Sequence, residues 1–228
     1  MTESSLFGEL GRDGMTRTAV ISPCGRYRYA LGRTWDIDLP PFVIVMLNPS
    51  TADEKVDDRT VQKCIAFARS KVCGGLLVVN LFAFRATEPA DMWAEARRGV
   101  DIVGPENDQH IRSIIRRIGP TSPPDAAWSS DPGAGDVVVG WGTPKSERDR
   151  PTHEARVRAV LQLIRAENRC AQSIGEQTKD GNPRHPLYLR LASQLRPWPG
   201  RSCGRGGCTL LALHLGGCVS GPAGRAVT

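Results

Sequence analysis

Four short apolar segments, each of which runs into polar residues, constrain the fold of this chain more than any other feature. They read VIVMLNPSTAD (43–53), GLLVVNLFAFRAT (75–87), VVVGWGTP (137–144) and RHPLYL (184–189). Runs of four to six apolar residues, rich in Val, Ile and Leu and bounded by Gly, Pro or Asn, are typical of buried strands in a parallel sheet. Ligands of open α/β sheets bind beyond the carboxyl ends of the strands. We therefore expect one edge of the sheet to bring together Asn48, Asn80, Trp141 and His185.

The segments around these strands predict an α/β fold of three layers, α/β/α, with a four-stranded parallel sheet. Helical spacing or helix-start residues favour helices at 60–72, 90–98, 104–119 and 151–170. The strands are expected at 42–47, 75–82 and 136–141, with the last one in 184–189. Residues 24–36 alternate Tyr and Leu with Arg and Gly, which predicts one or two antiparallel strands at the N-terminal edge.

The expected domain organisation is a single α/β domain at 21–199 between two less ordered ends. Residues 1–20 are polar and are expected to be flexible, and 120–135 is a Pro-, Ser- and Gly-rich surface loop. Residues 200–228 are rich in Gly and Cys and contain no acidic residue. They are interpreted either as a disordered tail or as the product of a shifted reading frame.

Composition excludes some classes of function. The chain has 228 residues and a net charge of +6, but 191–228 contains four Arg and no acid, so the rest carries only +2. Electrostatics alone therefore do not mark the body as a nucleic-acid binder. No segment is long and apolar enough for a membrane span, and the N-terminus lacks a signal-peptide pattern. The cysteines of the body are scattered singly, so we expect a cytoplasmic protein with reduced cysteines. We expect no metal or cofactor, since Cys203 and Cys208 lack a second pair of ligands.

The segment NPSTADEKVDD (48–58) combines an amide, hydroxyls and carboxylates directly after a strand. Pro49 restricts the backbone of Asn48, whose side chain can hold a water molecule. Any of three carboxylates can activate that water or stabilise positive charge on a sugar: Asp53, Asp57 or Asp58. The alternative for Asp57 and Asp58 is a turn in which Asp58 caps the next helix. We expect substrate contacts from Pro49, Ser50 and Thr51.

Asn80 is a polar residue in a strand that is otherwise apolar. Burying an amide without a partner costs about 1–3 kcal/mol. Its donor and acceptor atoms are suited to reading the edge of a base, and the alternative is a structural role in tying neighbouring loops together. Phe82 or Phe84 can stack on a base, although one of the two is expected in the core.

His185 lies in a Pro-bounded loop, where an imidazole can donate a hydrogen bond to a developing anion. The alternative is an exposed loop histidine. Phosphate contacts are expected from flanking cations, namely Arg85, Lys179 and Arg184, and Trp141 is expected to contact the substrate. Glu106, Asn107 and Asp108 open a predicted helix and are interpreted as capping residues.

Residues 26–190 resemble a bacterial and phage family, domain of unknown function 1643. The resemblance rests on the motifs MLNPSTAD, VVNLFAFRAT, GPENDQHI and TKDGNPRHPLYL.

The order of the four strand ends also resembles the uracil-DNA glycosylase superfamily. That resemblance implies a water-holding loop at Asn48-Pro49, a base-reading Asn80, a Trp-Gly strand end at Trp141, and a His185-Pro186 loop that donates to the departing base. It also implies a four-stranded parallel sheet flanked by helices and metal-free action on a flipped-out base. Two motifs depart from the family: Met46, Leu47 and Ser50 surround the water-holding pair, and Leu187 stands where the family has Ser. The departures favour a substrate other than uracil in ordinary DNA.

We therefore expect an enzyme that hydrolyses the N-glycosidic bond of a base in nucleic acid or in a nucleotide. The alternative is a module with the same sheet that binds nucleic acid or a nucleotide without cutting it. An accessory protein that contacts another protein is a third interpretation. The sequence predicts no oligomeric state.

Overall fold

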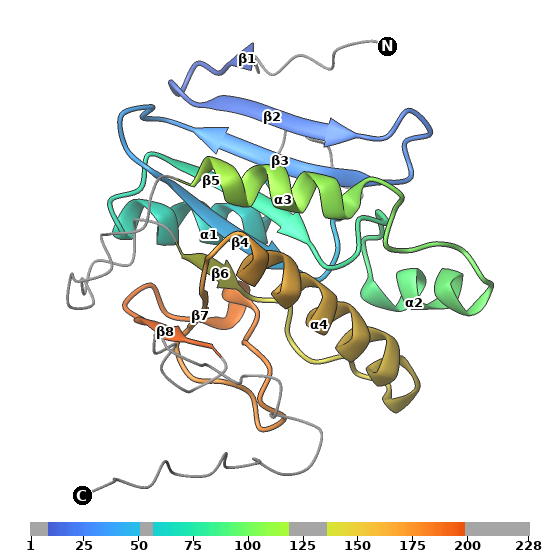
Figure 1. Cartoon of the computed structure of the whole chain (residues 1–228). Coiled ribbons are helices and arrows are strands. Elements are labelled where there is room, and N and C mark those ends of the chain that lie inside the picture. The colour runs from blue at the N-terminus through green and yellow to red at the C-terminus, as the bar shows by residue number, and fades with distance from the viewer. Residues whose placement is uncertain (1–8, 51–56, 119–135, 199–228) are drawn as a thin grey trace, which may run out of the picture.

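The chain folds around one mixed β-sheet with helices on both faces (Figure 1). The computed structural model describes residues 9–50, 57–118 and 136–198. The sheet has eight strands in the order β1-β2-β3-β5-β4-β6-β7-β8. Their bounds are β1 Glu9–Leu10, β2 Thr16–Ile21, β3 Arg28–Thr34, β4 Pro41–Met46, β5 Gly75–Asn80, β6 Val137–Val139, β7 Ala171–Ile174 and β8 Leu195–Pro197.

The centre of the sheet is parallel and its flanks are antiparallel. β5, β4, β6 and β7 run in the same direction, whereas β3 pairs with β5, and β8 with β7, in the antiparallel sense. In the register of β4 on β5, Met46 lies beside Asn80. The carboxyl ends of the parallel strands consequently meet at one edge, as expected for an open α/β sheet.

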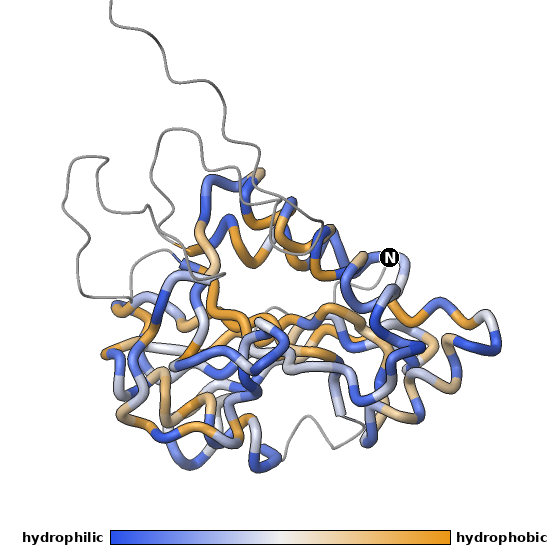
Figure 2. Tube along the Cα trace, turned by 90° about the horizontal axis from the view of Figure 1, so that it is seen from below, coloured by the Kyte–Doolittle hydropathy of each residue, from blue (hydrophilic) through white to orange (hydrophobic). Residues whose placement is uncertain are grey.

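Two helices cover one face of the sheet and a third covers the other. In Figure 1, α3 (Asn107–Arg117) and α4 (Arg150–Ala166) cross in front of the sheet, while α1 (Arg59–Ser70) lies behind it. α2 (Pro89–Arg97) lies to one side. The four predicted helices are confirmed, and their bounds differ from the predicted ones by a few residues. Along the helical trace in Figure 2, hydrophobic and hydrophilic residues alternate, as they do in helices that bury one face.

The alternation of the strands assigns each side chain to one of two cores. Val43, Val45, Val79, Val137 and Val139 pack in the core on the α3 and α4 face. Their neighbours along the same strands, which include Ile44, Met46, Val78 and Val138, pack in the core with α1. This two-residue period decides which layer each residue at the carboxyl edge faces.

The structure corrects the predicted strand at 184–189. Those residues form a loop with a short 3-10 helix at Pro186–Tyr188. The fourth parallel strand is β7, Ala171–Ile174, which directly follows the predicted helix over 151–170 and for which the sequence predicts no strand. Pro186 cannot donate a backbone hydrogen bond, so it disfavours a central strand at this place. The predicted four-stranded sheet is also too small, because further strands extend both edges.

The N-terminal prediction is wrong for residues 9–10 and 16–20, which belong to β1 and β2. β3 confirms an antiparallel strand within 24–36, but it pairs on both sides and is not an edge strand. The predicted loop at 120–135 and tail at 200–228, with Cys203 and Cys208, lie outside the described residues. No helix in the described parts has the length and apolar character needed to cross a membrane. The described cysteines form no disulfide with one another.

Candidate functional site at the carboxyl ends of the parallel strands

Asn48 follows β4 with its amide held in one orientation. Its Nδ2 donates to the carbonyl oxygens of Pro49, at 3.1 Å, and Ala86, at 3.0 Å. An amide nitrogen has two hydrogens, so both are used. The Oδ1 atom is left as an acceptor, and none of the described residues donates to it. This arrangement suits an amide that accepts a hydrogen bond from a water molecule or a substrate.

Asn80 ends β5 and is only 2 % exposed. By strand alternation its side chain shares the α1 face with Val78 and Met46. Within the part of the chain that the structure describes, the side-chain amide of Asn80 makes no hydrogen bond. Because the amide has no partner in the described chain and its N and O atoms are not fully enclosed, this side chain is a candidate for binding a ligand.

His185 lies on the same face, beside the start of α1. Asp58 is the N-cap of α1 and accepts from the backbone N–H groups of Thr60, at 2.9 Å, and Val61, at 2.8 Å. Its other oxygen accepts from the Ser50 hydroxyl at 3.1 Å. The charge of Asp58 acts on the imidazole of His185. Ser50, Asp58 and His185 thus form one group at the carboxyl edge.

The environment of His185 favours a neutral imidazole with a defined tautomer. Burial lowers its pKa, and the nearby Asp58 carboxylate opposes this only in part. Nδ1 accepts from the backbone N–H of Leu187 at 3.4 Å. In the neutral ring the proton then lies on Nε2, which is therefore the donor. A neutral donor of this kind can stabilise an anion that develops in front of it.

Two glycines after β6 allow the His185 loop to pack directly on the sheet. A Cβ on Gly140 would lie 3.0 Å from Cδ of Pro186 and 3.4 Å from Cδ1 of Ile44. Gly142 has a positive φ of 74°, and its N–H donates to the carbonyl of Pro183 at 3.0 Å. Both contacts hold His185 over the end of β6.

Backbone bonds join the segments after β4 and β5 into one unit. Leu81 N–H donates to Met46 at 2.8 Å, Phe82 N–H to Leu47 at 3.0 Å, and Ala86 N–H to Pro49 at 3.0 Å. Since Asn48 also donates to Ala86, the two candidate amides Asn48 and Asn80 belong to neighbouring, mutually fixed segments.

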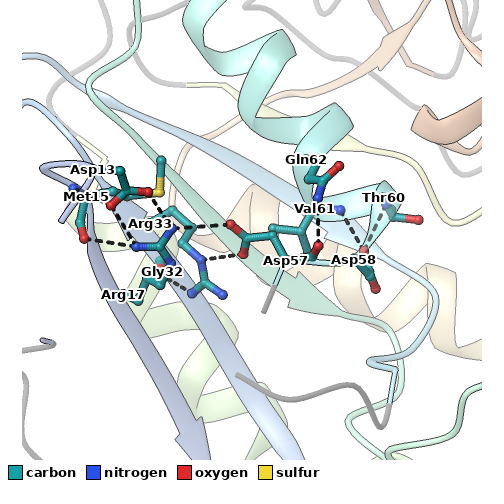
Figure 3. A network of polar contacts seen from close by, with 10 residues as sticks. All are labelled: Asp13, Met15, Arg17, Gly32, Arg33, Asp57, Asp58, Thr60, Val61 and Gln62. Atoms are coloured by element: carbon teal, nitrogen blue, oxygen red, sulfur yellow. Dashed lines mark hydrogen bonds and ion pairs between the residues drawn. The ribbon is translucent and has the colours of Figure 1, made fainter. Parts of the chain in front are cut away.

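Other predicted site residues have side chains that turn elsewhere. Phe82 is fully buried and packs edge-on against Trp93, with ring centroids 5.1 Å apart, so it cannot stack on a base. Trp141 shares the opposite face with Val139 and packs edge-on against Trp198 at 5.1 Å. Asp57 accepts from Nε of Arg33 at 2.7 Å, and Figure 3 shows this pair between the strands and the start of α1.

The remaining predicted residues have more varied positions. Arg85 donates through Nη1 to the carbonyl of Gly25 at 3.2 Å. Lys179 and Arg184 are exposed on the loop between β7 and His185. Thr51 and Asp53 lie outside the described residues.

Sequence reasoning does not find the roles of Tyr188 and Arg156, and it gives Asn107 a capping role instead of a contact to the sheet. Tyr188 is 82 % exposed, and its ring centroid lies 5.9 Å from that of His185. The apolar run at 184–189 predicts a buried strand for Tyr188, because such a run gives no signal for the side that a loop exposes. Asn107 and Arg156 are buried polar residues on helix faces that are mostly apolar, although α4 also buries His153. The helical spacing of Asn107 with Ile111 and Ile114 is the signal that could have found the first of them.

No curated protein and no solved structure matches the chain significantly. A family model described as protein of unknown function (DUF1643) matches residues 28–187. These residues contain all four parallel strands and the loops that carry Asn48, Asn80 and His185. The chain therefore belongs to the DUF1643 family.

Proposed function

We propose that the protein hydrolyses the N-glycosidic bond of a base, and that the reaction takes place at the carboxyl ends of β4, β5 and β6. The observation that supports this proposal most directly is that two polar groups of fixed orientation and one buried amide lie at the same edge of the sheet. Asn48 offers a fixed acceptor, His185 offers a neutral Nε2–H donor, and the Asn80 amide has no hydrogen bond in the described chain.

Each of these groups has a role in breaking a glycosidic bond. The bond breaks with positive charge on the sugar and negative charge on the departing base. His185 Nε2–H stabilises the base anion as the charge develops. The Asn80 amide donates to and accepts from the edge of the base. Asn48 Oδ1 accepts a hydrogen bond from the water that attacks the sugar, and the proton that this water loses goes to the departing base anion. Asp53, outside the described residues, is a candidate to stabilise the sugar cation.

The resemblance to uracil-DNA glycosylases supports these roles because the motifs occur in the same order along the chain. A parallel centre of four strands with helices on both faces is consistent with it. The two departures at Ser50 and Leu187 favour a modified base over plain uracil.

Exposed cations favour a polynucleotide over a free nucleoside. The loops after β6 and β7 carry exposed basic side chains that form no ion pair with a described residue: Lys145, Arg148, Lys179, Arg184 and Arg190. Nearby acids are paired with other arginines, Glu147 with Arg150 and Glu176 with Arg196. Phosphate neutralisation by such side chains makes binding dependent on salt. Tyr188, exposed next to His185, offers a face on which a base can stack.

The test is mass spectrometry of free bases released from normal and modified oligonucleotides, single- and double-stranded, and from nucleosides. We expect the parent protein to release one base. Asn48→Ala and His185→Ala should each lower the rate by about 10²-fold or more, since one removes the positioned water and the other the anion donor. Asn182→Ala removes a comparable amide from the same loop region and should leave the rate unchanged. Release at equal rates by the parent and Asn48→Ala would contradict the assigned role of Asn48.

A second function, binding without cleavage, is favoured by one observation. The two described carboxylates of the 48–58 segment are already engaged, Asp57 by Arg33 and Asp58 by the start of α1. A binding module predicts no base release from any member of the panel but measurable affinity for an oligonucleotide. In that case Asn80→Ala should weaken binding, while Asn182→Ala should not.

A further inference from the structure

Two helices contact the backbone at Asn80 and Leu81 from the face of the sheet opposite the candidate site: α3 contacts both residues and α4 contacts Leu81. Nδ2 of Asn107, the first residue of α3, donates to the carbonyl oxygens of Asn80, at 3.1 Å, and Leu81, at 3.2 Å. Nε of Arg156 on α4 donates to the same Leu81 carbonyl at 2.5 Å. All these groups are buried.

These bonds replace strand partners that the sheet does not supply. The pairing of β3 with β5 ends at Leu31 and Val78, before Asn80 is reached. The N–H of Leu81 still bonds to β4, through Met46. The carbonyls of Asn80 and Leu81 therefore lie in a gap of the pairing with β3, which resumes where Arg28 N–H donates to Ala83, and buried carbonyls need donors. Asn107 and Arg156 provide them.

The donors are themselves held in place. Nη2 of Arg156 is 2.6 Å from Oδ1 of Asp108, which joins α4 to the first turn of α3. The predicted role of Asn107 in capping is not what the structure shows, because its side chain turns toward the sheet and the N-cap, Glu106, makes no side-chain cap bond. The start of α3, the middle of α4 and the end of β5 thus form one connected unit.

We propose that Asn107 and Arg156 are positioning residues that set the orientation of the Asn80 amide in the candidate site. This inference rests on the proposed function for its consequence in catalysis, but not for its geometry. Within the described chain the Asn80 side chain has no hydrogen bond of its own. The position of the Asn80 side chain therefore depends on the position of its backbone. Asn107 fixes the Asn80 carbonyl, and Asn107 and Arg156 together fix the Leu81 carbonyl. A displacement of about 1 Å at a reacting group can cost about 10²-fold in rate.

The first test is an NMR measurement that needs no substrate. In protein labelled with ¹⁵N-asparagine, the side-chain NH₂ signals of Asn80 are assigned by their loss in Asn80→Ser. We expect Asn107→Ala to shift and broaden these signals, because the Asn80 peptide gains freedom. Arg156→Lys, which keeps the charge but replaces the Nε donor, should have a smaller effect in the same direction. It also provides the test if Asn107→Ala does not fold.

The matched control is Ile114→Ala. Ile114 lies on the same face of α3 and is buried, but it makes no hydrogen bond to the Asn80 or Leu81 peptides. It should destabilise the fold and leave the Asn80 NH₂ signals where they are. Unchanged Asn80 signals in folded Asn107→Ala and Arg156→Lys, or equal changes in Ile114→Ala, would overturn the positioning role.

The second test uses the base-release panel. If the parent releases a base, Asn107→Ala should lower kcat/KM by about 10–100-fold and change the ratio of rates between competing bases, because a misplaced amide reads the base edge less selectively. Ile114→Ala should keep that ratio. An unchanged ratio with perturbed NMR signals would reject the consequence for base reading. If the parent releases nothing from the panel, the proposed function fails, and the NMR result still decides whether the positioning role is correct.

Discussion

At the scale of single residues, the absence of a side chain at Gly140 is what allows His185 to lie against the sheet. A Cβ at this position would lie 3.0 Å from Cδ and 3.1 Å from Cγ of Pro186, closer than ordinary contact. Gly140→Ala should push the His185-Pro186 segment outward. Burial is the main cause that lowers the His185 pKa, so greater exposure should raise that pKa toward 6.5. An NMR titration of the imidazole measures this, and the curve of His153, which no described contact links to Gly140, serves as the internal control. An unchanged His185 titration would show that the loop tolerates the methyl group.

Residue positions could be predicted from the sequence where a polar side chain interrupts or ends an apolar run. Asn48, Asn80 and His185 stand out in this way, and the structure places all three at the carboxyl edge. Trp141 follows β6 equally closely, but the alternation of side chains along the strand places it in the core with Val139. This two-residue alternation is visible in the sequence. The identity of the face that carries the site is not, because it depends on which helices cover each layer.

At the scale of elements, the buried pair of Arg33 and Asp57 ties β3 to the start of α1 (Figure 3). Arg33 is 1 % exposed, and its Nε lies 2.7 Å from Asp57 Oδ1. Arg33 keeps its bond to the Gly32 carbonyl, but losing the carboxylate beside a buried guanidinium destabilises the fold, by up to about 3–5 kcal/mol for a broken buried pair. We therefore expect Asp57→Asn to lower the free energy of unfolding by an amount of this order, measured by urea denaturation. Asp13→Asn is the control at the exposed end of the same network: Asp13 pairs with Arg17, whose Nη2 also lies 3.9 Å from Asp57 Oδ2, and its loss should cost less than that of Asp57. Equal losses in the two variants would contradict this account.

Elements with a clear hydrophobic period could be predicted, and those without one could not. α1 was found because Val61, Cys64 and Ala68 recur at helical spacing. β7 was missed because its sequence, AQSI, is half polar, although all four of its residues are buried. Its Gln172 donates to Asp136, so a side-chain bond that the sequence does not announce allows a polar residue in a central strand.

At the scale of the whole molecule, His153 should make global stability depend on pH. It lies on α4, is 1 % exposed, and its Nε2 has no hydrogen-bond partner in the described chain. Burial lowers its pKa from 6.5 to about 4. Between these two values the unfolded chain binds a proton that the folded chain does not, so stability falls as pH falls from about 6.5 to about 4 and this contribution is constant below. A shift of this size corresponds to about 3 kcal/mol.

His153→Leu removes the imidazole from the buried face of α4. The difference in unfolding free energy between pH 7 and pH 4, measured by denaturation, should therefore be smaller in this variant by about that amount. Val160→Ala, which removes apolar volume from the same buried face of α4 and no titratable group, should keep the full acid loss of the parent. Parallel pH profiles for the parent and His153→Leu would mean that His153 accepts its proton in the folded protein as readily as in the unfolded chain.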